Sequence, residues 1–456
     1  MSTQQRLVLI IAIMASFVSF LDGSIVNVAL PAISHELGGG LALQQWVVDA
    51  YMITLGALML LAGSFSDLFG RRKILVIGLA GFGLASILCA AAPNGPFLIV
   101  ARALQGAAGA LLVPSSLALI ISAFSGPAQG KAIGSWTAWT GMSFILGSLL
   151  GGILVDSFSW EWIFLVNVAP IALTLWLMRR LEGPENIERN TRLDLRGGIL
   201  GILGLGGPVY ALIEQGRYGW GSPLIYLPFI LGLAIFAYFI WYERRCSNPM
   251  LPLSLFRVRN FSVGNLATLT IYGALGVATF LITIFVQQYG GYTALQAGLS
   301  MLPVTIIMFF LSPRFGALAG KSGPRLFMAV GPMIAAAGFL LMLTVDESVN
   351  YWTQLFPGVL LFGVGLSATV APLTSAVLGA INGKQAGIAS AVNNAVARIA
   401  GLITIAAIGL VSGVGSIGLD GFHRGLIFTA VLLLAGGITS AIGISNHQKP
   451  AKVVEV

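Results

Sequence analysis

Residues 63–73 read Gly63-Ser-Phe-Ser-Asp67-Leu-Phe-Gly70-Arg71-Arg72-Lys73, a turn with two glycines, one acid and three successive cations. Apolar stretches flank this turn in a chain of 456 residues, of which 57% are hydrophobic and only 9% are charged. Ordinary soluble domains carry about 25% charged residues, so this composition excludes that class. The sequence therefore predicts a membrane protein with many spans. The turn is predicted to be cytoplasmic, because Lys and Arg collect in short cytoplasmic loops.

Fourteen apolar windows are long enough for a membrane-spanning helix, which needs roughly 20 residues. They lie near 7–31, 45–65, 73–92, 97–124, 131–155, 160–180, 195–215, 222–242, 261–288, 294–318, 326–345, 351–378, 386–412 and 424–445. With the triple cation inside, alternate loops should be basic, and those loops do carry most of the other Lys and Arg residues. An even number of spans then places both termini in the cytoplasm. Topology, rather than nucleic-acid binding, accounts for the net charge of +8.

Two long polar breaks, residues 179–196 and 243–260, isolate a pair of helices between six before and six after. We therefore expect an all-α membrane fold with two six-helix bundles and two extra central helices. The expected domains are an N-terminal bundle (1–182), a linker with the extra pair (183–260), and a C-terminal bundle with a short cytoplasmic tail (261–456).

Residues 316–325 read Gly316-Ala-Leu-Ala-Gly320-Lys321-Ser-Gly323-Pro-Arg325 and resemble a degraded second copy of the opening turn. Gly320 stands where the first copy has Asp67. Internal repeats of this size, with the binding site at their interface, are typical of secondary transporters. The two bundles are therefore predicted to be repeats.

The turn at 63–73 fits the pattern G-x3-D-x2-G-R-R/K and resembles the loop between helices 2 and 3 of the major facilitator superfamily. A loop that only sets topology needs cations, but it needs neither Asp67 nor Gly70. The resemblance implies a gating role at the cytoplasmic face for Gly63, Asp67, Gly70, Arg71 and Arg72.

A second resemblance is carried by Leu21-Asp22-Gly23-Ser24-Ile25-Val26-Asn27-Val28-Ala29-Leu30-Pro31. It is similar to L-D-x-T-I-V-N-V-A-L-P of the fourteen-helix drug:proton antiporters, with Ser24 in place of Thr but the hydroxyl kept. An acid inside a span is costly, so it faces a cavity, finds a partner or takes up a proton. Asp22 is the predicted proton-coupling residue. The alternative is a structural tie between helix 1 and a neighbour.

A third resemblance lies in helix 4, where Arg102-Ala-Leu-Gln105-Gly106 is similar to the R-x-x-Q-G motif of the same superfamily. An arginine keeps its charge inside a membrane, and a fixed cation favours the ionised form of a nearby acid. The resemblance implies a role for Arg102 in proton transfer. A structural pair with an acid or with carbonyl groups is the alternative.

In helix 5, Gly147-Ser148-Leu-Leu-Gly151-Gly152 resembles the G-P-x2-G-G end of the antiporter motif, but Ser148 stands where proline is expected. The small residues predict close helix packing. The kink attributed to that proline is not expected, and support for antiport is reduced accordingly.

Further polar and aromatic side chains are candidates for a substrate cavity. Asp49 lies in helix 2, where the family more often has a small hydroxyl residue, and could bind a substrate cation or admit protons. Asn394 and Arg398 are four residues apart and share a helix face. The aromatic candidates could instead pack in the core or face lipid. The full set is Asp49, Asn27, Trp136, Trp139, Asn393, Asn394 and Arg398.

Together these patterns predict a secondary active transporter of the inner (cytoplasmic) membrane that exports amphiphilic or toxic small molecules in exchange for protons. It is expected to be a monomer in the bilayer, with no enzymatic activity, metal, cofactor or nucleic-acid partner, and the proton gradient supplies its energy. The three histidines, all in loops, support no catalytic or metal motif. Export of an endogenous lipid or metabolite is one alternative, and a non-transporting membrane sensor or scaffold is another.

Overall fold

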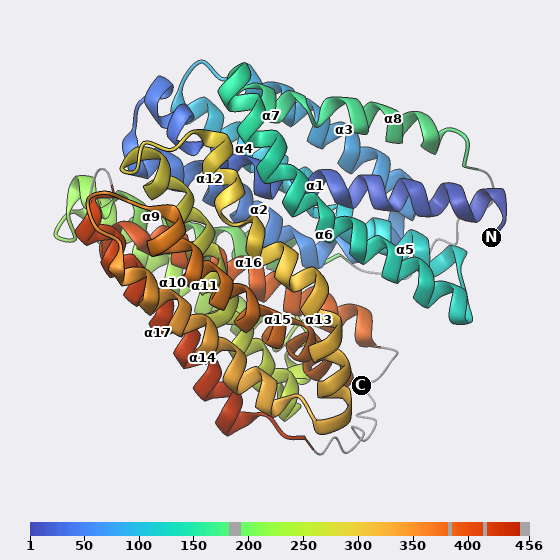
Figure 1. Ribbon diagram of the computed structural model, residues 1–456. Helices are drawn as coiled ribbons and strands as arrows, with labels where there is room; N and C mark the ends of the chain where they lie inside the picture. The colour runs from blue at the N-terminus through green and yellow to red at the C-terminus, as the bar shows by residue number, and fades with distance from the viewer. Residues whose placement is uncertain (182–192, 382–384, 414–416, 447–456) are drawn as a thin grey trace. The chain divides into compact units, whose positions relative to one another are not determined.

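The computed structural model describes residues 1–181, 193–381, 385–413 and 417–446, and all regular structure in these ranges is helical (Figure 1). Thirteen of the described segments are long and apolar enough to cross a membrane. The all-helical membrane fold predicted from the sequence is thereby confirmed. Most of the polar segment 179–196, the loop cation Lys384 and the C-terminal Lys449 and Lys452 lie outside the described residues.

The N-terminal part of the chain contains α1 (Thr3–Leu37), α2 (Gly40–Phe69), α3 (Arg71–Ala90), α4 (Gly95–Ala110), α5 (Leu112–Ala123), α6 (Gly126–Ser157), α7 (Trp162–Leu165) and α8 (Val168–Met178). Two helices, α9 (Leu195–Tyr218) and α10 (Pro223–Glu243), follow in the segment expected to hold the extra pair. The remaining α-helices are α11 (Arg259–Gln288), α12 (Ala294–Ser300), α13 (Leu302–Ser322), α14 (Arg325–Leu341), α15 (Phe356–Gly379), α16 (Ala386–Ser412) and α17 (Leu419–Gly443). Short helical turns are η1 (Leu253–Arg257), η2 (Met342–Thr344) and η3 (Tyr351–Leu355).

The sixth expected span, near 160–180, is shorter than the others. It forms a shorter apolar segment, Trp162–Met178, which is interrupted between α7 and α8 at Val166 and Asn167. Pro170 explains the interruption, because it has no N–H to donate to the carbonyl of Val166 one turn earlier. The break leaves the side chain of Asn167 at the junction of the two short helices.

The chain divides into two compact units. The first contains Met1–Pro208, Pro228–Met250 and Thr293–Gly298, and the second contains Val209–Leu227, Leu251–Tyr292 and the described parts of Leu299–Val456. Within the first unit α1 packs on α6 and α8, α2 on α4, and α3 on α4 and α8. Within the second unit α11 packs on α16 and α17, α13 on α15, and α14 on α15 and α17. The same order of helices thus gives the same pairs in both units, as a repeat would.

The two turns that resemble one another in sequence also share a backbone conformation. Gly70 ends α2 with φ 95°, and its N–H donates to the Ser66 carbonyl at 3.1 Å. Gly323 ends α13 with φ 91°, and its N–H donates to the Ala319 carbonyl at 2.9 Å. Positive φ strongly favours glycine, which has no Cβ to clash with the backbone. The second copy therefore keeps the turn although it has lost the acid.

Candidate functional site

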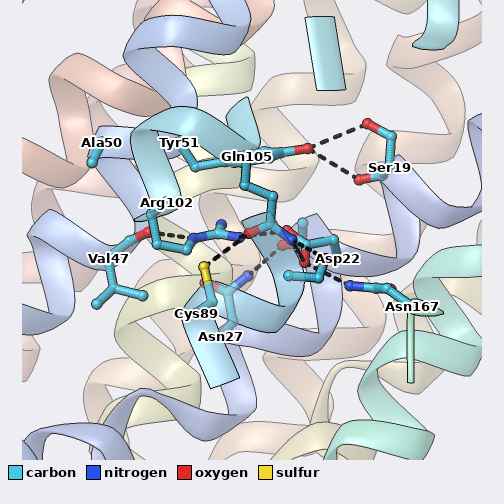
Figure 2. A network of polar contacts seen from close by, with 12 residues as sticks. Ser19, Asp22, Asn27, Val47, Ala50, Tyr51, Cys89, Arg102, Gln105 and Asn167 are labelled. Carbon is cyan, nitrogen blue, oxygen red and sulfur yellow. Dashed lines mark hydrogen bonds and ion pairs between the residues drawn. The ribbon is translucent and has the colours of Figure 1, made fainter. Parts of the chain in front are cut away.

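A buried ion pair joins α1 to α4 inside the first unit (Figure 2). Nη1 of Arg102 lies 2.6 Å from Oδ2 of Asp22, and the side chains are 1% and 0% exposed. The structure thus brings together the two residues that the sequence motifs singled out separately. A charge at this depth needs a partner, because an isolated ion inside a membrane protein is costly.

Two amide side chains complete the bonding of the Asp22 carboxylate. Nε2 of Gln105 donates to Oδ1 of Asp22 at 2.9 Å. Nδ2 of Asn167, at the break between α7 and α8, donates to the same oxygen at 3.0 Å. Hydrogen bonds to an ionised acceptor are shorter and stronger than neutral ones. Three helical segments, α4, α7–α8 and α1, therefore meet on one carboxylate.

The guanidinium of Arg102 is fixed on its other sides as well. Nε donates to the Val47 carbonyl of α2 at 2.9 Å, and Nη1 also donates to Oε1 of Gln105 at 2.6 Å. Its Cζ lies 4.3 Å from the centre of the Tyr51 ring, a cation–π contact. Figure 2 shows Arg102 lying between Val47 and Asp22. The cation is thus held in place independently of the acid.

The network continues outward from Gln105 and Tyr51. Nε2 of Gln105 also donates to Oγ of Ser86 at 2.9 Å, and Sγ of Cys89 lies 3.5 Å from its Oε1. The Tyr51 hydroxyl donates to the Ser19 carbonyl at 3.3 Å. The sequence motif included Gln105 but gave it no role. Asn167, Ser86 and Tyr51 were missed, and the signal for Asn167 was an amide beside a proline in an otherwise apolar span.

The glycine motif Gly147–Gly152 belongs to α6 and lies against the Asp22 segment of α1. A Cβ added at Gly147 would lie 2.7 Å from Oγ of Ser24, and one at Gly151 would lie 2.8 Å from Cγ1 of Ile25. A Cβ at Gly152 would meet the backbone of residue 295, 2.3 Å from its Cα. Small residues are therefore needed at Gly147 and Gly151, where α6 crosses α1, and at Gly152, where α6 meets α12.

The two departures from the antiporter motifs, Ser24 and Ser148, contact each other. Their hydroxyl oxygens are 3.3 Å apart, and the Ser24 hydroxyl donates to the Phe144 carbonyl at 2.9 Å. Helix α6 runs through Ser148 without interruption. Phe144 is four residues before Ser148, so its carbonyl is the one that a proline at position 148 would leave without its helical donor.

Asp49 is, like Asp22, a fully buried acid of the first unit. Neither of its carboxylate oxygens has a hydrogen-bond partner in the described part of the chain. A buried carboxylate in that condition is costly, and native proteins keep such groups mainly for function. Its surroundings thus contrast with those of Asp22, where both oxygens are bonded.

The other cavity candidates of the first unit are held in different ways. Nδ2 of Asn27 donates to the Gly23 carbonyl of its own helix at 3.1 Å. Nε1 of Trp136 donates to Oγ of Ser16 at 3.0 Å, which ties α6 to α1. Trp139 is 51% exposed. None of these three side chains contacts the Asp22 carboxylate through a described hydrogen bond.

Asn393, Asn394 and Arg398 belong to α16 in the second unit. Nδ2 of Asn393 donates to Oδ1 of Asn265 at 3.1 Å and to Oγ1 of Thr268 at 2.9 Å, so it joins α16 to α11. Nδ2 of Asn394, which is exposed, donates to the Ser390 carbonyl of its own helix. Arg398 is partly buried.

The cations of the opening turn reach into the first unit. Nη1 of Arg71 donates to the Ala118 carbonyl at 3.3 Å, and Nη1 of Arg72 donates to the Leu181 carbonyl at 3.1 Å. A Cβ added at Gly63 would meet nothing within 4 Å, so no close approach requires glycine there. The side chain of Asp67 lies outside the described part of the structure.

Comparison with known proteins places this arrangement in a family. The model of the Major Facilitator Superfamily matches residues 12–405. Puromycin resistance protein pur8 of Streptomyces alboniger is 36% identical over 414 residues, which cover 89% of this chain and 81% of that protein. Multidrug resistance protein Stp of Mycobacterium tuberculosis is 35% identical over 412 residues, which cover 90% of this chain and 76% of that protein.

The solved structure of a D-xylose-proton symporter has a TM-score of 0.68 at 13% identity and covers 98% of this chain and 99% of its own, which is a likeness of fold alone. The family match begins in α1 and extends through most of α16, and it includes both members of the buried ion pair. With relatives above 30% identity over most of its length, the chain belongs to the Major Facilitator Superfamily.

Proposed function

We propose that the chain is a secondary active transporter of the cytoplasmic membrane that exports amphiphilic or toxic small molecules in exchange for protons. The names of its relatives support export, since they describe resistance to puromycin and to multiple drugs. The main support for proton coupling is the buried ion pair of Asp22 and Arg102. In this proposal the chain spans the membrane fourteen times with both termini inside. The broken segment Trp162–Met178 is the sixth span and is added to the thirteen longer ones.

The carboxylate of Asp22 is the proposed proton carrier. In the ionised state it accepts hydrogen bonds from Arg102, Gln105 and Asn167, which tie α1 to α4 and to the α7–α8 break. A proton on this group removes its charge and weakens all three bonds at once. Arg102 keeps the Val47 carbonyl as a partner, so the cation remains in place while α1 is released.

Alternating access follows from that change in bonding. Proton uptake from outside loosens the first unit, and release to the inside restores the ties, while the substrate moves in the opposite direction. Asp49, buried without a hydrogen-bond partner in the described chain, is the proposed second acid. It would bind a cationic substrate or pass protons towards Asp22. The cytoplasmic turn with Asp67, Arg71 and Arg72 would control opening of the inner face.

The test is transport by purified protein in liposomes with an imposed proton gradient, using ethidium as a lipophilic cation. Asp22→Asn should abolish gradient-driven flux but keep downhill exchange of the substrate. Asp346→Asn, a change of the same chemistry at an exposed acid, should leave both unchanged. Undiminished gradient-driven flux in Asp22→Asn would refute the assignment of the proton to Asp22.

A further inference from the structure

A cavity of about 560 Å³ opens in the first unit between α2, α3, α4 and α9. Its lining is apolar or glycine apart from a single cation, Lys73. It is separate from the Asp22 network, since none of the residues of that network lines it. Representative lining residues are Leu58, Phe69, Lys73, Ile77, Leu195 and Ile199.

The cavity begins where α2 ends and α3 and α9 begin, and it extends along α2. Phe69 is the last residue of α2, Lys73 lies in the first turn of α3, and Leu195 is the first residue of α9. From Phe69 back to Leu58 the wall follows α2 for about 16 Å, at 1.5 Å per residue. The hydrocarbon core of a bilayer is about 30 Å thick, so the cavity is as deep as one leaflet.

One side of the cavity is open and the other is closed. Ile199 and Ile77 are 58% and 49% exposed, as expected for side chains at an opening towards lipid. On the closed side a Cβ added at Gly198 would lie 2.5 Å from Cδ1 of Leu61, so α9 touches α2 there. An occupant therefore enters sideways from the bilayer, or from the end marked by Lys73.

The cation at that end is Lys73. Lys73 is exposed and makes no hydrogen bond or ion pair with the described residues. Its neighbours Arg71 and Arg72 are directed to the protein carbonyls of Ala118 and Leu181. The three cations mark this end as cytoplasmic, where the leaflet is rich in anionic lipid.

We propose that this cavity binds an anionic phospholipid of the cytoplasmic leaflet, with one acyl chain between α2, α3 and α9 and the phosphate at Lys73. A polar ligand would find no partner along the apolar wall, whereas an acyl chain fits its depth and needs none. The headgroup phosphate is complementary to the ammonium at the open end. The site gives the first of the two central helices a role of its own, as one wall of a lipid site.

The test is native mass spectrometry of the purified full chain after incubation with phosphatidylglycerol or with phosphatidylcholine of the same acyl chains. Lys73→Gln should retain phosphatidylglycerol about fivefold less well, as expected for one cation near a lipid surface, and should leave phosphatidylcholine unchanged. Lys131→Gln, an exposed cation of α6, is the matched control and should match the unmodified protein. Equal retention of phosphatidylglycerol by Lys73→Gln and the control would overturn the proposal.

A second pair of variants tests the apolar wall. Ile199→Trp should fill the cavity and reduce retention of both lipids, whereas Leu203→Trp, on the same helix and 52% exposed but outside the lining, should not. Unchanged lipid retention in Ile199→Trp would exclude the site. If that variant kept its lipid but lost ethidium transport, the cavity would be an entry path for substrate, and the lipid proposal would be wrong.

Discussion

Arg102 and Asp22 form an ion pair of 2.6 Å in which neither side chain reaches the surface. Removing one member leaves the other buried alone, but the two single losses are not equivalent. Arginine cannot give up its proton inside a protein, whereas a lone carboxylate can take one up and become neutral.

We therefore predict that Asp22→Leu lowers the free energy of unfolding by about 3–5 kcal/mol and that Arg102→Leu lowers it by less. The double variant should be more stable than Asp22→Leu alone, because no unpaired charge remains. Thermal unfolding of the detergent-solubilised proteins measures all three. Equal losses in the two single variants would show that the pair is not the dominant interaction at this site.

Asn167 should matter although no sequence motif includes it. Asn167→Leu removes one of the two amide donors to Oδ1 of Asp22 and should cost about 1–2 kcal/mol of stability. Gradient-driven transport should fall with it, because the ionised carboxylate is held less well. Asn248→Leu is the control, because that amide is exposed and donates to the neighbouring Ser247 hydroxyl. Indistinguishable melting and transport of the two variants would contradict the role of Asn167.

Ser148→Pro should be tolerated better than proline elsewhere in α6. A proline in a helix costs about 3 kcal/mol, partly because a carbonyl one turn earlier loses its donor. At position 148 that carbonyl is Phe144, which already accepts from the Ser24 hydroxyl. We expect Ser148→Pro to cost about 1 kcal/mol less than Ile145→Pro, because no described side chain donates to the Gly141 carbonyl that Ile145→Pro would leave without its helical donor.

The same variants made in a Ser24→Ala background separate this explanation from others. Without the hydroxyl the advantage of position 148 should disappear, which is a coupling that a double-mutant cycle measures. If the difference between the two prolines survives, the tolerance has another cause.

Close packing of α1 and α6 predicts opposite outcomes for two glycines of one helix. Gly147→Ala places a Cβ 2.7 Å from Oγ of Ser24 and should destabilise the protein by about 1–3 kcal/mol. Gly141→Ala meets nothing within 4 Å and should be neutral or stabilise it by about 0.5–1 kcal/mol, through better helix propensity. Thermal unfolding of the two alanine variants decides this, and a loss at Gly141 as large as at Gly147 would argue against the contact.

The helices could be predicted closely because a helix that crosses the hydrocarbon core needs a long run of apolar residues, and such runs can be read from the sequence. The break near Asn167 could not, since hydropathy averaged over a window hides a single amide and a single proline.

The site was predictable only in part. Motifs identified Asp22 and Arg102 because each residue is unusual inside a span, but pairing between residues distant in the chain depends on tertiary packing. Asn167 lies 145 positions from Asp22, and no local pattern connects them. That no described residue bonds to the Asp49 carboxylate is likewise a property of its surroundings rather than of its sequence.

The matching turns at Gly70 and Gly323 separate two kinds of information that the opening sequence combines. Shape is specified by one residue in a left-handed conformation, and it survives in the second copy. Charge is specified by the neighbouring side chains, and the second copy keeps only Lys321 and Arg325 and has no acid. The protein thus contains two turns of the same backbone conformation, one with Asp67 and three successive cations and one without them. Gly320→Asp would place an acid at the second turn and leave Gly323, which makes the bend, unchanged.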